Sequence, residues 1–454
     1  MKTKAFSMHI SEREPNSLFL PYTVSDVQRL KAVSFGTRVV ECEIKTDYLS
    51  DSTITIGAAL AMELQLPFAA PVHIFIQDDT AVIGPLIGIF TAGFTDSHLR
   101  PIGERSLFFA NMLSANDTNK AYIFVFGSHQ INWKEGTIHA YFYNEQRWVQ
   151  HEVPFPNVVY DRLPNRKTEN HRAIARVKSR LQNEYTIPWF NPGFFNKWDI
   201  YKQLERNPLA QPYLPETHIF SNFEQIERIL SKYGHVYIKP MNGSLGKSIY
   251  QIRYAFEENM YYCRYRDENG NKLRKYSSLE YLINHLLGNY DLQDFIVQQG
   301  ISLFRMNGNP VDFRVHTNKD RLGQWRLSAV AAKIAGQGSM TTHINNGGDV
   351  KTLEEMFPDS MQRQEIQQKL SSATLLLSAC IDEQIDGYIG EIGFDMGMDK
   401  HGKVWLFEAN SKPGRAIFEH PKLRESDRLT RELFLEYAFH LTERALYAPE
   451  DLFQ

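Results

Sequence analysis

The chain has 454 residues, of which 43% are hydrophobic and 13% are aromatic. Such a composition can fill a full-sized core, so it excludes a chain that is mainly disordered, collagenous or of low complexity. Lys and Arg number 50 against 53 Asp and Glu, a formal net charge of −3. Without a global positive field, we expect a packed multidomain protein whose partners include neither nucleic acid nor a membrane.

Cysteine usage and the amino terminus indicate the compartment. Cys42, Cys263 and Cys380 are far apart and form no CxxC pair, so neither a zinc site nor a disulfide framework is indicated. The amino terminus becomes charged and polar within its first residues and lacks the apolar segment of a signal peptide. The longest apolar stretches fall well short of the roughly 20 residues that a membrane helix needs. These features predict a cytoplasmic protein.

Residues 1–90 are predicted to form a small β-rich domain. Gly, Pro and Asp-Asp signals separate the expected strands from one another and from a helical patch at Gly57–Leu64. The expected strands are Thr37–Ile44, Val72–Ile76 and Ala81–Ile83. No cluster of acids, bases or metal ligands stands out here, so we assign this domain no reaction.

Residues 91–195 are predicted to form a small α/β domain. The expected strands are Tyr122–Phe126, Ile138–Phe142, Arg147–Val149 and Val158–Tyr160. A basic helix over His171–Gln182 follows, and the turn-rich string IPWFNPG (187–193) ends the domain.

Residues 196–450 alternate between helical and strand patterns. Ser277 and Glu280 have the spacing of a capping box before an apolar helix. The other expected helices are Lys197–Arg206, a stripe from Ile366 to Ile381 and a stripe from Leu429 to Leu441. The expected strands are Val236–Lys239, Ile296–Gln298, Val311–Val315 and Leu327–Ala332, with a hairpin tip at Glu268–Asn271.

A glycine-containing loop follows the strand that ends in Lys239. Its sequence, Asn242-Gly243-Ser244-Leu245-Gly246-Lys247, lets backbone N–H groups approach phosphate oxygens, because glycine has no Cβ in the way. A Walker A loop needs a glycine five positions before Gly246, where Met241 stands, so the P-loop reading fails. Taken alone, such a loop is more often a polar turn between strands.

Three oxygen-bearing side chains near the carboxyl end have the chemistry of a magnesium site. A turn at Asp399–Gly402 would pair two strands and bring Asp395 beside Glu408 and Asn410. Glu408 and Asn410 are two positions apart on a strand and so share a face. Carboxylate and amide oxygens suit Mg²⁺ that bridges nucleotide phosphates. The alternative to a metal site is an acidic face of the hairpin that lies in water, and we expect this for Asp399.

The joint order of these segments resembles the ATP-grasp superfamily over residues 196–450. The segments are Lys239, Gly243–Gly246, Ile296–Gln299, Asp312–Arg314, Lys333, Gly393–Asp395, Glu408–Asn410 and Pro413–Gly414. The strings LPET (214–217), GEIGFDMGMDKHGKVWLFEANSKPGR (390–415) and GPLIGIF (84–90) are similar to the YheC/YheD group of endospore coat-associated proteins of bacilli. The length and the extra amino-terminal domain are closer to its YheD members.

This resemblance implies a multidomain α+β and α/β protein. Two α+β subdomains of an ATP-grasp fold would enclose ATP, preceded by a pre-ATP-grasp α/β domain and an amino-terminal β-rich domain. Lys197 and Lys239 would hold the α and β phosphates, although Lys202 is an equal candidate for the place of Lys197. The loop residues Gly243, Ser244, Gly246 and Lys247 would close over the phosphates.

The resemblance also implies the remaining contacts. Gln298, Gln299 and Ile301 would contact adenine, with Gln299 standing where the family often has an acid for the ribose. Arg314 and Lys333 would meet the terminal phosphate, and Asp395, Glu408 and Asn410 would hold Mg²⁺. Arg415 either clamps a substrate carboxylate or pins its own turn. His343 stands where related ligases have an asparagine, which points to a changed acceptor or a lost function.

The implied reaction is a ligation. ATP would phosphorylate a small-molecule or peptide carboxylate to an acyl phosphate, and an amine would displace the phosphate. Spore-coat proteins are expected partners, with the protein at the forespore or spore coat of a sporulating cell. The alternative is a non-catalytic coat-assembly protein that retains the fold and binds nucleotide.

Overall fold

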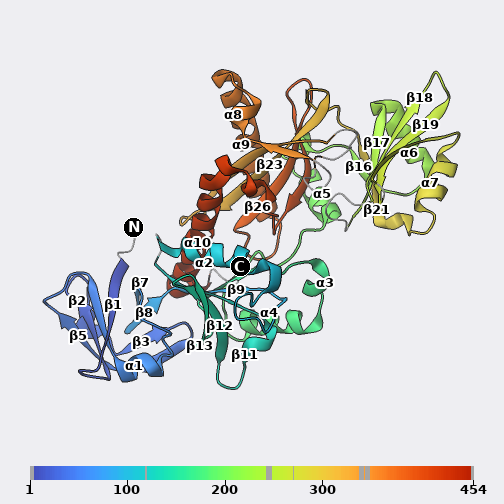
Figure 1. Ribbon diagram of the computed structural model, residues 1–454. Helices are drawn as coiled ribbons and strands as arrows, with labels where there is room; N and C mark the ends of the chain where they lie inside the picture. The colour runs from blue at the N-terminus through green and yellow to red at the C-terminus, as the bar shows by residue number, and fades with distance from the viewer. Residues whose placement is uncertain are drawn as a thin grey trace.

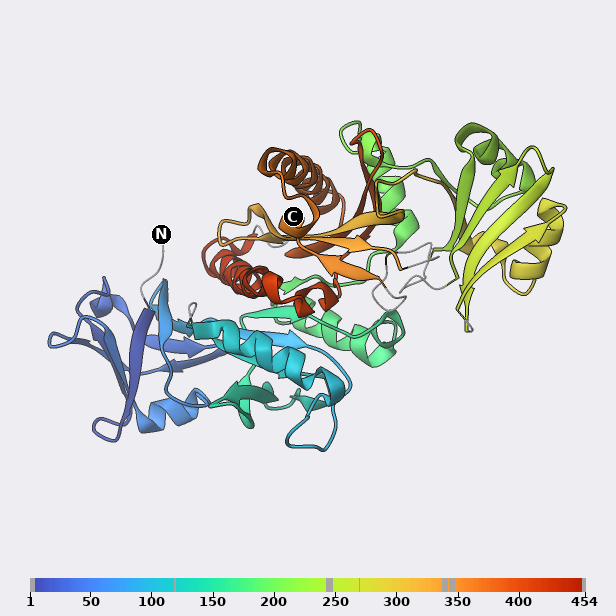
Figure 2. The same cartoon turned by 45° about the horizontal axis from the view of Figure 1, so that its top comes forward.

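The computed structural model describes residues 5–117, 120–241, 248–268, 270–336, 342 and 348–450. Within them the chain forms four sheets that follow one another along the sequence. Figure 1 shows β1 to β8 at one end of the molecule and the sheet of β16 to β21 at the other, and Figure 2 shows the same order from a second direction. The third and fourth sheets form the region expected to enclose ATP.

The first sheet has the strand order β4-β3-β8-β7-β1-β6-β2-β5. Its strands are β1 (Ala5–Ser11), β2 (Ser17–Pro21), β3 (Ala32–Phe35), β4 (Arg38–Glu41), β5 (Glu43–Asp47), β6 (Thr53–Gly57), β7 (Val72–Gln77) and β8 (Thr80–Gly84), with α1 (Ala58–Glu63) after β6. The single strand predicted over Thr37–Ile44 is wrong. The chain changes partners at Cys42, because β4 pairs with β3 whereas β5 pairs with β2.

The second sheet is built around buried parallel strands. Its strands are β9 (Leu86–Phe90), β10 (Tyr122–Phe126), β11 (Ile131–Asn132), β12 (Thr137–Asn144), β13 (Arg147–Pro154), β14 (Val158–Asp161) and β15 (Trp189–Phe190). Its helices are α2 (Ser106–Leu113), α3 (Arg166–Glu169) and α4 (Arg172–Asn183). Strand β9 pairs in parallel with both β10 and β14, and all three strands are buried, as expected for parallel strands covered on both faces.

The third sheet is antiparallel with the order β16-β21-β17-β18-β19-β20. Its elements are β16 (Thr217–Ile219), α6 (Phe223–Tyr233), β17 (His235–Pro240), β18 (Tyr250–Ala255), β19 (Met260–Asp267), β20 (Gly270–Tyr276), α7 (Leu279–Leu287) and β21 (Phe295–Gln299). Val236, Ile238 and Ile252 share a core with α6 and α7, so the alternate residues of β17, including Lys239, face the other way. The predicted capping box is wrong: Ser278, in extended conformation, caps α7 by accepting from the N–H of Tyr281, and this leaves Leu279 buried at the first helical position.

The fourth sheet has the main order β25-β24-β23-β26-β27, with β22 beside β23. Its strands are β22 (Arg305–Met306), β23 (Asn309–Lys319), β24 (Trp325–Ile334), β25 (Asp349–Lys351), β26 (Glu391–Met398) and β27 (Val404–Asn410). The helices around it are α5 (Lys197–Glu205), α8 (Leu353–Met356), α9 (Ser360–Asp382) and α10 (Arg424–Tyr447). Phe313, Val315 and Phe394 share a core with α5 and α9 on one face, which leaves the opposite face for polar side chains.

Most of the other expected elements are confirmed. The patch at Gly57–Leu64 is α1, the basic helix is α4, and the two carboxyl-terminal stripes are α9 and α10. The hairpin of β19 and β20 pairs Asp267 with Gly270, as its tip predicts. Short 3-10 helices cover Val27–Arg29, Gly103–Arg105, Ser114–Asp117, Ser128–Gln130, Gln211–Tyr213, Leu292–Asp294, Ala416–Glu419 and Pro421–Leu423. None of the described helices has both the length and the apolar character to cross a membrane.

Candidate active site

A cavity of about 840 Å³ lies between the third and fourth sheets, and we call it the central cavity. Every described residue of the predicted site lines it. These residues are Lys197, Lys239, Gln298, Gln299, Ile301, Arg314, Lys333, Asp395, Glu408, Asn410 and Arg415. Gly243, Ser244, Gly246, Lys247 and His343 lie outside the described residues. Positions from seven different helices and strands therefore converge on one space.

The hairpin of β26 and β27 sets the acidic wall of this cavity. Asp395 is the direct cross-strand partner of Glu408, and Arg314 on β23 is the partner of Asp395 on its other side. Direct partners in an antiparallel sheet share a face, so these three side chains form one row across three strands. Asn410 stands two residues beyond Glu408, opposite Gly393, on the same face.

Asp399 holds the turn of this hairpin rather than standing free in water, as the sequence had suggested. Its carboxylate accepts from the N–H groups of His401 and Lys403 and from the indole of Trp405 at 3.0 Å. Burial raises the pKa of Asp399, but these hydrogen bonds outweigh it and the pKa lies below its ordinary value. A turn fixed in this way fixes the register of Asp395 and Glu408.

Opposite charges alternate along this wall. The Lys333 ammonium lies 2.8 Å from Asp395 and 3.1 Å from Asp312, and Arg314 lies 3.2 Å from Asp395. Burial lowers the pKa of Lys333, but the charges of Asp312 and Asp395 outweigh it and raise that pKa above its ordinary value. Lys333 is therefore a charged group at neutral pH, held in place by two carboxylates.

One lysine reaches the central cavity from the start of α5. Lys197 begins α5, whose N-cap Asn196 accepts from two backbone N–H groups, and its ammonium lies 3.4 Å from Glu408. Lys202 does not line the cavity and pairs instead with Glu205 at 3.0 Å. Of the two candidates, the structure brings Lys197 to the predicted site.

Lys239 enters the cavity from the third sheet. Its ammonium donates to Gln298 Oε1 at 2.6 Å, and Gln298 in turn donates to Thr217 at 3.0 Å. Burial and the positive charge of Lys197 lower the pKa of Lys239 to about 8, against the pull of nearby carboxylates. This lysine therefore changes its charge not far above neutral pH.

The end of β21 supplies a neutral, partly apolar wall. The N–H of Gln299 donates to the carbonyl of Glu216 at 2.8 Å, and its side-chain oxygen accepts from the N–H of Glu216 at 3.1 Å. Ile301, Leu303 and Leu406 add apolar surface beside it. Such a wall suits a flat, weakly polar group better than a charged one.

The acidic wall has the donors for a hard cation. Asp395, Glu408 and Asn410 present oxygen atoms from paired strands on a single face. In the part of the chain that the structure describes, no three His, Cys, Asp or Glu residues gather as a metal site. Two carboxylates and one amide oxygen are too few to enclose a cation wholly in protein. They would suit Mg²⁺, which keeps several waters and is shared with phosphate oxygens.

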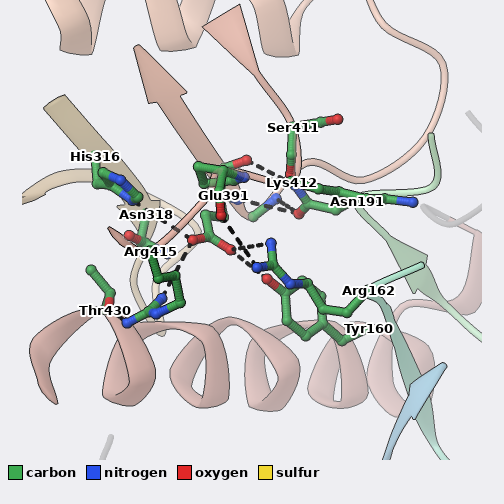
Figure 3. Close-up of polar contacts among 12 residues, drawn as sticks. Tyr160, Arg162, Asn191, His316, Asn318, Glu391, Ser411, Lys412, Arg415 and Thr430 are labelled. Carbon is green, nitrogen blue, oxygen red and sulfur yellow. Dashed lines mark hydrogen bonds and ion pairs between the residues drawn. The ribbon is translucent and has the colours of Figure 1, made fainter. Parts of the chain in front are cut away.

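Arg415 belongs to a buried ionic network behind the cavity (Figure 3). It donates to Asp427 and to the hydroxyl of Thr430, both on α10, and lies 3.8 Å from Glu391. These are the contacts of an arginine that pins its own turn, although its side chain also lines the central cavity.

Glu391 is the centre of this network, and it joins the second sheet to the fourth. It accepts from the hydroxyl of Tyr160 and lies 3.9 Å from Arg162, with side-chain exposures of 3% for Glu391 and 9% for Arg162. Burial raises the pKa of Glu391, but His316, Arg162 and Arg415 outweigh it and lower the pKa to about 2. Sequence reasoning missed this pairing, because Tyr160 and Glu391 are 231 positions apart and no local pattern links them.

Comparisons with known proteins agree with this architecture. Residues 186–441 match the family model described as YheC/D-like ATP-grasp. The chain is 44% identical over 463 residues to the endospore coat-associated protein YheD of Bacillus subtilis strain 168, covering 100% of this chain and 99% of that protein. It is 23% identical over 271 residues to the endospore coat-associated protein YheC of the same organism, covering 59% of this chain and 73% of that protein.

Among solved structures, a D-alanine–D-alanine ligase from Bacillus anthracis complexed with ATP has a TM-score of 0.46 and 13% identity to this chain. That match covers 80% of this chain and 99% of the ligase. The family match and the full-length relative confirm the fold that the order of segments predicted. The chain belongs to the YheC/YheD-like ATP-grasp family.

Proposed function

We propose that the chain is an ATP- and Mg²⁺-dependent ligase that joins a carboxylate to an amine, with a peptide or spore-coat component as substrate. The observation that supports this proposal is the convergence of cations from both sheets on the acidic wall of the central cavity. Lys239 comes from the third sheet, whereas Arg314, Lys333, Asp395, Glu408 and Asn410 come from the fourth.

In this proposal the cations bind the triphosphate. Lys197 and Lys239 hold the α and β phosphates, and Arg314 and Lys333 meet the terminal phosphate, where negative charge shifts during phosphoryl transfer. Gly243, Ser244, Gly246 and Lys247 keep their predicted role as further phosphate contacts. Gln298, Gln299 and Ile301 form the adenine wall.

Asp395, Glu408 and Asn410 would hold the magnesium ion. When bound, this ion would neutralise phosphate charge and fix the geometry of the triphosphate. The pairing of β26 with β27 holds the two carboxylates in register, so little ordering of the chain is needed when the ion binds.

The reaction needs positioning rather than a protein nucleophile. A substrate carboxylate oxygen attacks the γ-phosphorus, the bond to the β,γ-bridging oxygen breaks, and ADP leaves. The amine nitrogen then attacks the acyl carbon of the acyl phosphate, phosphate departs with the bonding pair, and the nitrogen loses a proton. The walls of the cavity hold the reactants close together and keep water from the acyl phosphate.

The test measures phosphate or ADP release with a panel of carboxylates and amines. We expect release that requires an added acceptor and disappears in Asp395→Ala and Glu408→Ala. Glu354→Ala is the matched control, because Glu354 is exposed on α8 and lies outside the cavity. Nucleotide binding without turnover across a broad panel would contradict the proposed reaction.

A second candidate is a coat-assembly protein that binds nucleotide without catalysis. It is favoured by the relatives' description as endospore coat-associated proteins. In a sporulating strain that lacks the gene, full rescue by the Glu408→Ala protein would support this candidate, and failed rescue at normal protein levels would support the ligase. Mass spectrometry of coat peptides from wild type and deletion strain would identify an added amino acid or isopeptide bond.

A further inference from the structure

A second cavity, of about 720 Å³, lies beside the central cavity on the same face of the third sheet. Tyr237, Ile301 and Leu303 line both cavities and so form the wall between them. Along β17 the second cavity is lined by His235 and the central cavity by Lys239. Four residues of strand span roughly 13 Å, so the second cavity is a neighbouring space and not the phosphate end of the first.

Three arginines from different strands line this second cavity, which we call the basic cavity. Arg253 lies on β18, Arg264 on β19 and Arg305 on β22. Tyr237, Gln251 and Arg264 form a row of direct partners across three strands, so their side chains share a face. The arginines thus reach the cavity from two sheets.

The hydroxyl of Tyr237, a residue that lines the basic cavity, accepts from Gln251 at 2.9 Å. Burial raises the pKa of Tyr237, and the positive charges of Arg253, Arg264 and Arg305 all oppose that rise. One hydroxyl therefore lies in the field of all three guanidinium groups.

No carboxylate balances this charge. The residues that line the basic cavity include no Asp or Glu. Within the described ranges no ion pair joins Arg253, Arg264 or Arg305 to a carboxylate, and the guanidinium of Arg305 donates to the carbonyl of Gly308 at 2.5 Å. Glu258, which accepts from Tyr262 of the cavity wall, is already paired with Lys275.

We propose that the basic cavity is a second ligand site, which binds a molecule carrying at least two oxyanion groups, either carboxylates or phosphates. Arg253 and Arg305 are exposed and Arg264 is half-buried. Planar guanidinium forks bind oxyanion groups with paired hydrogen bonds, and a bound anion offsets the mutual repulsion of the three arginines. The volume is in the range of small-molecule sites. The site does not depend on the ligase reaction proposed above.

The test is calorimetric titration of the full chain with two probes in separate experiments, inorganic tripolyphosphate and the peptide Glu-Glu-Glu. We expect at least one probe to bind, and the double variant Arg253→Gln/Arg264→Gln to weaken its affinity about tenfold or more, since two charged hydrogen-bond donors are lost. Binding of tripolyphosphate alone would assign a phosphate ligand, and binding of the peptide alone a carboxylate ligand.

Two controls separate this site from general charge and from the central cavity. Arg266 lies on β19 two residues beyond Arg264 and outside the cavity, so Arg266→Gln is expected to change probe affinity less than about twofold. Tripolyphosphate resembles the triphosphate proposed for the central cavity, so each titration is repeated with Lys239→Gln, which removes a cation from that cavity alone. A binding event that persists in Lys239→Gln and weakens in Arg253→Gln/Arg264→Gln belongs to the basic cavity. Failure of both probes to bind, an equal loss in Arg266→Gln, or the absence of any binding event that persists in Lys239→Gln would overturn the proposal.

Discussion

The central cavity and the basic cavity share a wall but differ in charge. The first is lined by both acidic and basic side chains, and the second by basic ones without acidic ones. In the central cavity, lysines and an arginine are paired with Asp312, Asp395 and Glu408 at distances of 2.8 to 3.4 Å. In the basic cavity, three arginines have no carboxylate among the lining residues. Tyr237, Ile301 and Leu303 separate these two environments.

This difference shows what each cavity is suited to bind. A cavity with both signs of charge can accept a cation and a polyanion together, because the carboxylates meet the cation while the lysines meet the phosphates. A cavity whose charged side chains are all positive suits an anion without an accompanying cation. The four predictions that follow test this contrast, beginning with the largest expected effect.

The acidic row of the central cavity is expected to be essential for turnover. Glu408→Ala and Asp395→Ala should lower the proposed ligase activity on the order of 10²- to 10³-fold, because each removes an oxygen ligand of the proposed magnesium site and a counter-charge of the neighbouring cations. Steady-state ADP release measures the effect, with Glu354→Ala as control. Near wild-type turnover in either variant would mean that the acidic row has no part in catalysis.

The buried network behind the cavity is expected to be essential for stability. Glu391→Gln should lower the free energy of unfolding by about 3 kcal/mol, because Arg162 and Arg415 lose their buried counter-charge. Urea denaturation followed by tyrosine and tryptophan fluorescence measures it, with the exposed Glu354→Gln expected to change stability by less than about 0.5 kcal/mol. Equal stability of the two variants would show that the network contributes little.

Nucleotide affinity is expected to fall as Lys239 loses its proton. With a pKa of about 8 in the free protein, Lys239 is mostly charged at pH 7 and mostly neutral at pH 9, so binding at the higher pH must include uptake of a proton. The affinity for a non-hydrolysable ATP analogue should fall about tenfold over this interval. Lys239→Arg, whose guanidinium stays protonated, should give a flat profile. The same pH dependence in both proteins would assign the titration to another group.

The smallest effect distinguishes the two lysines of α5. Lys197→Ala should weaken nucleotide binding about fivefold, because Lys197 lines the central cavity, whereas Lys202→Ala should change it less than about twofold. Both substitutions are made in the same helix, so they match in helix propensity. Fluorescence titration with a nucleotide analogue measures both. A larger loss in Lys202→Ala would reverse the assignment.

Much of the fourth sheet could be predicted from the sequence, because its information is local. A turn at Asp399–Gly402 pairs two short strands, and their register brings Asp395 opposite Glu408 without any distant contact. The strand before Lys239 and most of the helices were likewise predicted by periodicity within a few residues of their ends. The resemblance to ATP-grasp proteins then suggested roles for these residues, which periodicity alone does not.

The features that the sequence did not predict depend on contacts between distant segments. Nothing near Tyr160 or Glu391 in the sequence indicates their pairing, since it arises only when β14, β26 and α10 pack together. The basic cavity was missed for a similar reason: Arg253, Arg264 and Arg305 each look like an ordinary surface arginine in its own strand. The break of the predicted strand at Cys42 also depends on partner strands that the local pattern does not specify.

The most direct test of the central cavity is calorimetric titration with a non-hydrolysable ATP analogue, with and without Mg²⁺. We predict binding to the wild-type chain that strengthens with Mg²⁺, and no such strengthening in the double variant Asp395→Ala/Glu408→Ala. Absence of binding to the wild-type chain in the presence of Mg²⁺, or an equal effect of Mg²⁺ in the double variant, would contradict the account.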